Sequence, residues 1–126
     1  MKIKKVTFLG AGTWGITLGK LLYEKGHQVS FWDLNEDYVK ILQQKRENRK
    51  SLPGVILAPN IEITANLVNA TDQAEVFVFV SPSHLIRKIT KLVKKLVINR
   101  PQIVVIATKG IEGKSLKRMS EVVGEE

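Results

Sequence analysis

Three glycines, Gly10, Gly12 and Gly15, have the spacing G-x-G-x-x-G and constrain the fold of this chain more than any other feature. They follow an apolar run of β-forming residues at 6–9, which has the length of a buried strand. They precede a segment from Thr13 to about Lys25 in which apolar residues recur at helical intervals. The sequence therefore predicts a strand, a tight turn and a helix in direct succession.

The order of strand, glycine turn and helix gives each glycine a chemical role. The first permits the turn, the second lets a pyrophosphate approach the backbone, and the third lets the helix lie close to the strand. The free N–H groups and the positive dipole end of the helix then face the phosphates. The spacing alone is weak evidence, so the flanking strand and helix are what favour a dinucleotide site over an ordinary strand–turn–helix.

A second apolar strand, at 29–32, ends at Asp33, about 20 residues after the first glycine. An acid at this offset binds the hydroxyls of the adenosine ribose in dinucleotide-binding folds. An aspartate also repels the additional phosphate of NADP, so Asp33 favours NAD. The alternative is that Asp33 caps the following helix, expected from about Asn35 through Arg46. The residues expected to point inward from that helix are Val39, Ile41 and Leu42.

Strand and helix patterns continue to alternate along the rest of the chain. Gly26 is placed to end the first helix. Further strands are expected at 61–64, 76–80 and 103–107, and further helices at 67–70, 85–96 and 114–123. The alternation predicts one α/β domain over residues 1–126, with a doubly wound parallel sheet of about five strands and helices on both faces. Right-handed crossovers predict the strand order 3-2-1-4-5.

Ligands bind to such a sheet outside the carboxyl ends of its strands. The glycine turn, Asp33, the segment Ser81-Pro82-Ser83 and Lys109 all follow strands, so we expect them to meet at that edge. By spacing alone Lys109 is an ordinary solvated lysine in a turn. Its place on the ligand edge favours contact with an anionic substrate or with the cofactor.

The serines after the fourth expected strand and the two histidines of the chain have structural explanations. Ser81 or Ser83 is expected to cap the helix that follows, with Pro82 in its first turn. His84 is expected to begin the same helix beside the site. His27 follows a helix-ending glycine at the opposite edge of the sheet and is expected to be structural.

The composition narrows the class of partner. The formal net charge of +8 suits a polyanion, but the basic residues are scattered and aromatic residues make up only 6%, so no nucleic-acid partner is expected. The apolar stripe and basic side at 85–96 are shared by membrane-surface helices, but packing on the sheet with a solvated basic side is favoured. Without cysteine there is no disulfide or thiolate zinc site, and no metal is expected. With no signal peptide and no membrane-spanning run, we expect a cytoplasmic location and no membrane partner.

Several motifs together resemble the N-terminal, Rossmann-like domain of NAD(P)-dependent glycerol-3-phosphate dehydrogenase, and the resemblance covers nearly the whole chain. The motifs are Gly10-Ala-Gly-Thr-Trp-Gly15, Gly26-His27-x-Val29 leading to Trp32, Asn48 followed by Leu52-Pro53-Gly54, Val80-Ser-Pro82-Ser83, Lys109-Gly-Ile-Glu112 and Met119-Ser-Glu-Val122. The chain departs from the family at Leu34, where many NADP-using members have a basic residue. It also departs at Ser51, where an aromatic residue is usual.

The resemblance implies a set of site residues. Thr13 and Trp14 would line the cofactor phosphates, and Lys109 would contact cofactor and substrate and stabilise negative charge near the reacting oxygen. Leu34, Pro82 and Leu85 would border the adenosine and the nicotinamide. With the glycine turn, the expected cofactor-binding residues are Gly10, Ala11, Gly12, Thr13, Trp14, Gly15, Asp33, Leu34, Pro82, Leu85 and Lys109.

The family reaction passes hydride between the nicotinamide and carbon 2 of sn-glycerol 3-phosphate, giving dihydroxyacetone phosphate. The resemblance implies that a second lysine, the general base, belongs to a C-terminal helical domain that also holds the substrate phosphate. We therefore expect this chain to be the nucleotide-binding half of an oxidoreductase of glycerophospholipid metabolism, to bind NAD rather than NADP, and to show no turnover alone. A regulatory NAD-binding module without catalysis is the alternative, and a homodimer is compatible with the sequence.

Overall fold

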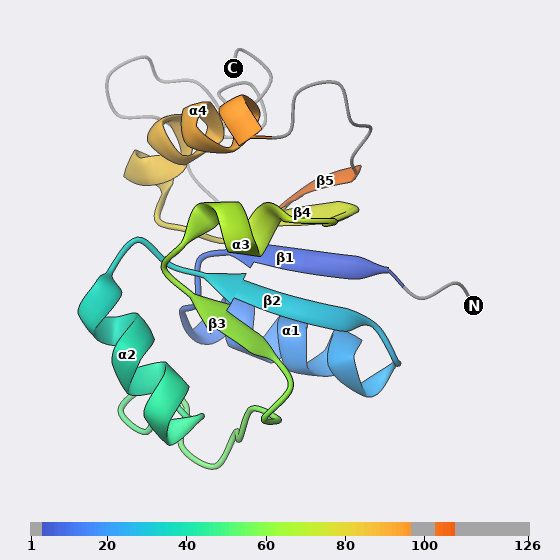
Figure 1. Cartoon of the computed structure of the whole chain (residues 1–126). Helices are drawn as coiled ribbons and strands as arrows, with labels where there is room; N and C mark the ends of the chain where they lie inside the picture. The colour runs from blue at the N-terminus through green and yellow to red at the C-terminus, as the bar shows by residue number, and fades with distance from the viewer. Residues whose placement is uncertain (1–3, 97–102, 108–126) are drawn as a thin grey trace.

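The computed structural model describes residues 4–96 and 103–107 of this chain. Lys109 and the helix expected at 114–123 therefore lie outside the described residues. Within the described part the elements alternate as the sequence predicts, from a first strand near the N-terminus to a fifth strand that ends before Ala107 (Figure 1).

The five strands form one parallel sheet with the order β3-β2-β1-β4-β5 (Figure 1). The strands are β1 (Lys5–Leu9), β2 (Gln28–Trp32), β3 (Glu62–Thr64), β4 (Val76–Phe79) and β5 (Ile103–Ile106). The predicted strand order is thus confirmed. Parallel neighbours require crossover connections, and the helices of the structure lie in these connections.

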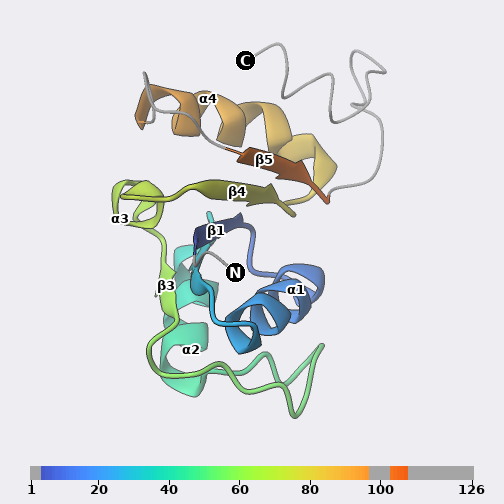
Figure 2. The ribbon, with the colours of Figure 1, turned by 90° about the vertical axis from the view of Figure 1, so that its right-hand side faces the viewer.

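Helices cover both faces of the sheet, which confirms the doubly wound architecture. They are α1 (Thr13–Glu24), α2 (Glu36–Lys45), α3 (Leu67–Thr71), the 3-10 turn η1 (Ser83–Leu85) and α4 (Ile86–Leu96). Figure 2 shows α1 and α2 on one side of the sheet and α3 and α4 on the other. Successive side chains of a strand point to opposite faces of the sheet. Phe8 packs in the core beneath α1 and α2, whereas Leu9 packs in the core beneath α3 and α4.

A glycine in α1, the helix that connects β1 to β2, lets this helix lie close to the sheet. Gly19 of α1 faces the buried ring of Phe31, and a Cβ at this position would lie 2.2 Å from the Phe31 Cζ atom. The Phe31 ring in turn packs against Phe8, with ring centroids 5.2 Å apart. Gly26 follows α1 with a φ of 97°, a left-handed conformation that suits glycine just beyond a helix end, so its expected role is confirmed.

Three local expectations need correction. Ile41 of α2 is exposed, because residues two apart on a helix lie about 200° around its axis and Val39 faces the core. The fourth strand ends at Phe79, one residue earlier than expected. The segment after it enters α4 through the 3-10 turn η1, for which Pro82 stands at the N-cap with no side-chain cap bond.

Candidate functional site

The register of the sheet brings four strand ends to one rim. Leu9 of β1 lies opposite Trp32 of β2 and opposite Phe79 of β4, and Phe79 lies opposite Ile106 of β5. Backbone hydrogen bonds continue beyond these ends. The Gly10 N–H, for example, donates to the Trp32 carbonyl at 2.8 Å. The glycine turn and Asp33 therefore start side by side.

A cavity of about 730 Å³ opens at this rim, within the size range of cofactor sites. Its lining is Gly10, Gly12, Thr13, Trp14, Asp33, Leu34, Asn35, Val80, Ser81, Pro82, Ser83, Leu85 and Ala107. Eight of the eleven expected cofactor-binding residues are in this lining, while Ala11 and Gly15 are buried. Lys109 lies outside the described residues, although Ala107, two positions before it, lines the cavity.

Close contacts leave no room for a side chain at the first and the third glycine. Gly10 has a φ of 128°, and a Cβ there would lie 2.9 Å from the Ser81 backbone nitrogen. A Cβ at Gly15 would lie 2.6 Å from the Gly10 carbonyl oxygen and 3.1 Å from a methyl group of Val80. These contacts confirm the expected tight turn and the close approach of helix and strand.

The second glycine faces open space. A Cβ at Gly12 would meet no protein atom within 4 Å, and Gly12 has an extended backbone conformation that any residue adopts. Gly12 is also the N-cap of α1, which has no side-chain cap and no acidic residue in its first turn. The first N–H groups of the helix have no partner within it. The site thus offers room and free amide donors for an anion, which is what a dinucleotide phosphate requires.

Asp33 joins the end of β2 to the glycine turn. Its Oδ2 accepts the Ala11 N–H at 2.9 Å, and its Oδ1 accepts the Asn35 N–H at 3.0 Å. The cap of α2 is Asn35, whose side chain accepts the Tyr38 N–H, so the alternative that Asp33 caps this helix is wrong. A carboxylate has about four acceptor positions, and the ones left over remain for ribose hydroxyls.

Sequence reasoning missed a second set of contacts behind the glycine turn. The Tyr38 hydroxyl of α2 donates to the Ala11 carbonyl, and the Asn48 side-chain amide donates to the Tyr38 oxygen at 3.2 Å. Burial raises the pKa of the Tyr38 phenol, and the Asp33 charge adds to this, while the hydrogen bond from Asn48 acts the other way. The phenol therefore stays protonated and able to donate at neutral pH.

The segment after β4 is held at the rim by contacts that differ from the expected helix cap. The Ser81 hydroxyl donates to the Leu9 carbonyl at 2.6 Å, so this serine bonds to the end of β1, and the N-cap position of the 3-10 turn is Pro82 instead of a serine. The Pro82 carbonyl accepts the Leu85 N–H at 2.9 Å, which closes the 3-10 turn. The effect is to present Pro82 and Leu85 as apolar lining beside the glycine turn.

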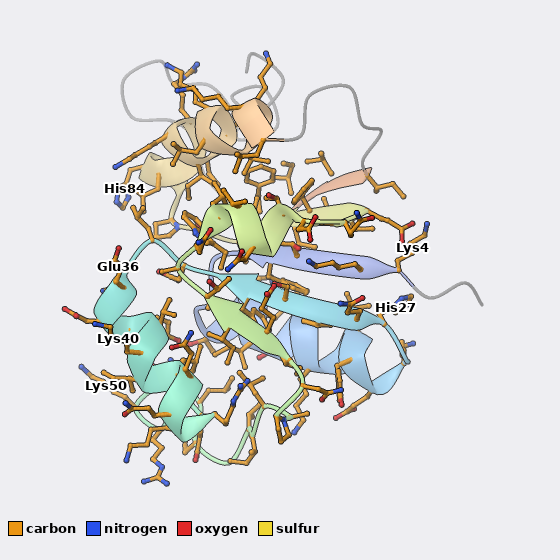
Figure 3. The ribbon with its side chains drawn as sticks, viewed as in Figure 1. Lys4, His27, Glu36, Lys40, Lys50 and His84 are labelled. Carbon is orange, nitrogen blue, oxygen red and sulfur yellow. The ribbon has the colours of Figure 1, made fainter. Side chains whose placement is uncertain are left out.

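The two histidines lie at opposite edges of the sheet (Figure 3). His27 accepts the Lys4 N–H through Nδ1 at 3.3 Å, which confirms its structural role away from the site. His84 lies in η1 near the rim and is exposed, although only its neighbours Ser83 and Leu85 line the cavity. Among the described lining residues Asp33 is the one ionisable side chain.

Comparison with known proteins decides the family. The family model described as the N-terminus of NAD-dependent glycerol-3-phosphate dehydrogenase matches residues 5–126. The chain belongs to this family. It is 34% identical over 122 residues to a glycerol-3-phosphate dehydrogenase [NAD(P)+] of Fusobacterium nucleatum, covering 97% of this chain and 36% of that protein. The corresponding enzyme of Pelotomaculum thermopropionicum is 40% identical over 122 residues, covering 97% and 35%.

A solved structure of the family has the same fold. The crystal structure of glycerol-3-phosphate dehydrogenase from Coxiella burnetii superimposes with a TM-score of 0.89 at 27% identity, covering 98% of this chain and 38% of that one. The chain thus spans about a third of the length of these glycerol-3-phosphate dehydrogenases. Its described helices include none with the length and apolar character needed to cross a bilayer.

Proposed function

We propose that the cavity at the sheet rim binds NAD, with the pyrophosphate at the N-terminus of α1 and the adenosine ribose at Asp33. The observation that carries this proposal is the open space at Gly12, where a side chain would meet no protein atom within 4 Å. A glycine that the fold itself does not need there is explained by a ligand that approaches the backbone. The adjoining N-terminal amides of α1 supply the hydrogen-bond donors.

The remaining expected residues have compatible positions in this proposal. Leu34 lines the cavity next to Asp33, where an adenine ring attached to the bound ribose would lie. Pro82 and Leu85 add apolar surface from the segment after β4, which suits the nicotinamide. Lys109 stays a prediction, as contact to cofactor and substrate, because it follows the described end of β5.

NAD is proposed over NADP on electrostatic grounds. The described lining holds the Asp33 carboxylate and no lysine or arginine that would pair with a 2′-phosphate. A 2′-phosphate and a carboxylate repel each other, whereas ribose hydroxyls donate to a carboxylate. Lys40 and Lys50, labelled in Figure 3, belong to α2 and the loop after it and are not part of the described lining.

The reaction proposed for the protein is that of its family. Hydride would pass between the nicotinamide and carbon 2 of sn-glycerol 3-phosphate, with dihydroxyacetone phosphate as the ketone. Residues 1–126 would form the dinucleotide-binding domain of such an enzyme. The family match favours this over a regulatory module. The cytoplasmic location, the role in glycerophospholipid metabolism and a homodimer stay predictions.

Titration with reduced cofactors tests the proposal. Trp14 lines the cavity, so bound NADH should quench tryptophan emission and accept its excitation energy. We expect saturable binding of NADH and weaker binding of NADPH under the same conditions. Equal or tighter binding of NADPH would contradict the role of Asp33. The absence of binding by either cofactor would contradict the site itself.

A further inference from the structure

We propose that Tyr38 is a positioning residue for the glycine turn, and that it raises the affinity for the dinucleotide without touching it. This inference rests on the proposed NAD site. It assigns an indirect role in binding to Tyr38 of α2 and to Asn48, the first residue of the Asn48 to Gly54 motif. Two of the three contacts that carry it are made to the peptide groups of Ala11, by Asp33 and by Tyr38, and the third joins Asn48 to the Tyr38 hydroxyl.

The peptide groups on both sides of Ala11 are held by side chains. The Asp33 carboxylate accepts the Ala11 N–H at 2.9 Å, and the Tyr38 hydroxyl donates to the Ala11 carbonyl. Ala11 itself is completely buried. The turn between β1 and α1 is thus fixed by one side chain from α2 and another from the end of β2.

The Ala11 carbonyl and the Gly12 N–H belong to the same peptide unit. Because a trans peptide is planar, its N–H points opposite to its carbonyl, and no cis peptide occurs in the described residues. Fixing the Ala11 carbonyl toward Tyr38 therefore fixes the Gly12 N–H away from Tyr38, and Gly12 lines the cavity. A hydrogen bond accepted by the carbonyl also polarises the N–H and makes it a stronger donor to phosphate.

Asn48 decides the direction of the Tyr38 hydroxyl. Its side-chain nitrogen donates to the Tyr38 oxygen at 3.2 Å, so the hydroxyl proton is left for Ala11. Asn48 is in turn held by its own loop: its Oδ1 accepts the Ser51 N–H at 3.1 Å, and its carbonyl accepts the Leu52 N–H at 2.8 Å. The loop with the Leu-Pro-Gly motif is thereby connected to the phosphate-binding turn.

The test compares two tyrosine variants, because the chain has only two tyrosines. Tyr38→Phe keeps the ring and removes the hydroxyl. Tyr23→Phe is the matched control, since its hydroxyl also donates to one oxygen, Asn60 Oδ1 at 2.6 Å, away from the described cavity lining. We expect Tyr38→Phe to weaken NADH and ADP-ribose binding roughly fivefold, the effect of one lost hydrogen bond, and to leave adenosine binding unchanged. Tyr23→Phe should match wild type for all three ligands.

Amide hydrogen exchange without any nucleotide separates this inference from the proposed function. Tyr38→Phe should speed exchange at residues 10–13 and leave the β1 and β2 amides unchanged. Wild-type exchange in that variant would overturn the inference, as would an equal loss of adenosine and NADH affinity, which indicates general destabilisation. If wild type bound no NADH while this local exchange effect appeared, the proposed function would fail and the positioning contact would stand.

A second variant covers the case in which Tyr38→Phe folds poorly. Asn48→Asp keeps the Oδ1 acceptor for the Ser51 N–H but replaces the donor to Tyr38 by a second acceptor. The carboxylate then competes with Ala11 for the hydroxyl proton, so NADH affinity should fall while adenosine affinity holds. Unchanged NADH affinity in Asn48→Asp would overturn the inference.

Discussion

At the scale of single residues, the glycines of this chain differ in what a side chain would meet. A Cβ at Gly10 or at Gly15 would meet backbone and side-chain atoms within about 3 Å, whereas Gly12 faces open space. The G-x-G-x-x-G spacing predicted the tight turn at Gly10 and the close helix approach at Gly15, because both follow from the path of a strand into a helix. The role of Gly12 toward a phosphate stays a prediction. A substitution at Gly12 therefore separates ligand binding from folding.

We predict that Gly12→Ala leaves the unfolding temperature within about two degrees of wild type and weakens NADH binding at least about tenfold, because the new methyl occupies the approach of the phosphate. Thermal denaturation followed by circular dichroism and the fluorescence titration of NADH measure the two effects. A variant that binds NADH as tightly as wild type would contradict the proposed pyrophosphate position.

We predict that Asp33→Asn narrows the difference between NADH and NADPH affinity. The amide oxygen can still accept one backbone N–H, so the contact to Ala11 or to Asn35 survives, while the negative charge that repels a 2′-phosphate is lost. Parallel titrations of both cofactors at low and moderate salt measure this. A ratio of affinities that stays as in wild type would show that the charge of Asp33 does not select the cofactor.

At the scale of helices and strands, the spacing between α1 and the sheet is set by glycine. We predict that Gly19→Ala lowers the free energy of unfolding by about 1–3 kcal/mol, because its Cβ would lie 2.2 Å from Phe31 Cζ and Phe31 is completely buried against Phe8. Urea denaturation measures the change. A variant as stable as wild type would mean that the helix shifts without cost.

The loop after α2 contains an acid whose charge supports its conformation. Glu47 accepts the Gly54 N–H at 2.9 Å, and this bond lowers its pKa, with a further contribution from Arg49. Because the pKa of Glu47 is lower in the folded state, its charged carboxylate stabilises the fold at any pH above the unfolded-state pKa, ~4.3 for glutamate. This stabilisation is lost as the pH falls through the folded-state pKa.

We therefore predict that Glu47→Gln is less thermally stable than wild type at neutral pH, and that the difference closes as the pH is lowered below the ordinary glutamate pKa. Melting temperatures of both proteins across the acid range measure it. Glu75, a partly exposed acid paired with Lys4, offers the control Glu75→Gln, for which we expect a smaller difference at neutral pH. A Glu47→Gln difference that is constant with pH would contradict the role of the charge.

The elements themselves were predictable because their periodicities are strong. Buried parallel strands read as short apolar runs, and the helix at 86–96 shows a clear stripe with Ile86, Ile89 and Val93 buried. Details that depend on competing contacts were not predictable. The bond from the Ser81 hydroxyl to the Leu9 carbonyl, for example, joins residues 72 positions apart, and only the assembled sheet brings them together.

At the scale of the whole molecule, the location of the site followed from topology. Parallel strands end at one rim, so the strand order alone was enough to place three separate sequence features together. The Tyr38 and Asn48 contacts could not be placed in this way, since a tyrosine in a helix and an asparagine in a loop carry no motif for a contact to the glycine turn. The one sequence signal was Asn48 itself, at the start of the Asn48 to Gly54 motif.

The last prediction concerns what a polypeptide of these 126 residues does by itself. It spans 36% of its Fusobacterium nucleatum relative, and the described cavity lining holds one ionisable side chain, Asp33, which already accepts two backbone N–H groups. That lining offers no group suited to take the proton from the substrate hydroxyl as hydride leaves. We predict NADH binding without measurable oxidation of sn-glycerol 3-phosphate, assayed by absorbance at the reduced nicotinamide band. Robust turnover by this polypeptide would show that its own residues, Lys109 first among them, suffice for the reaction.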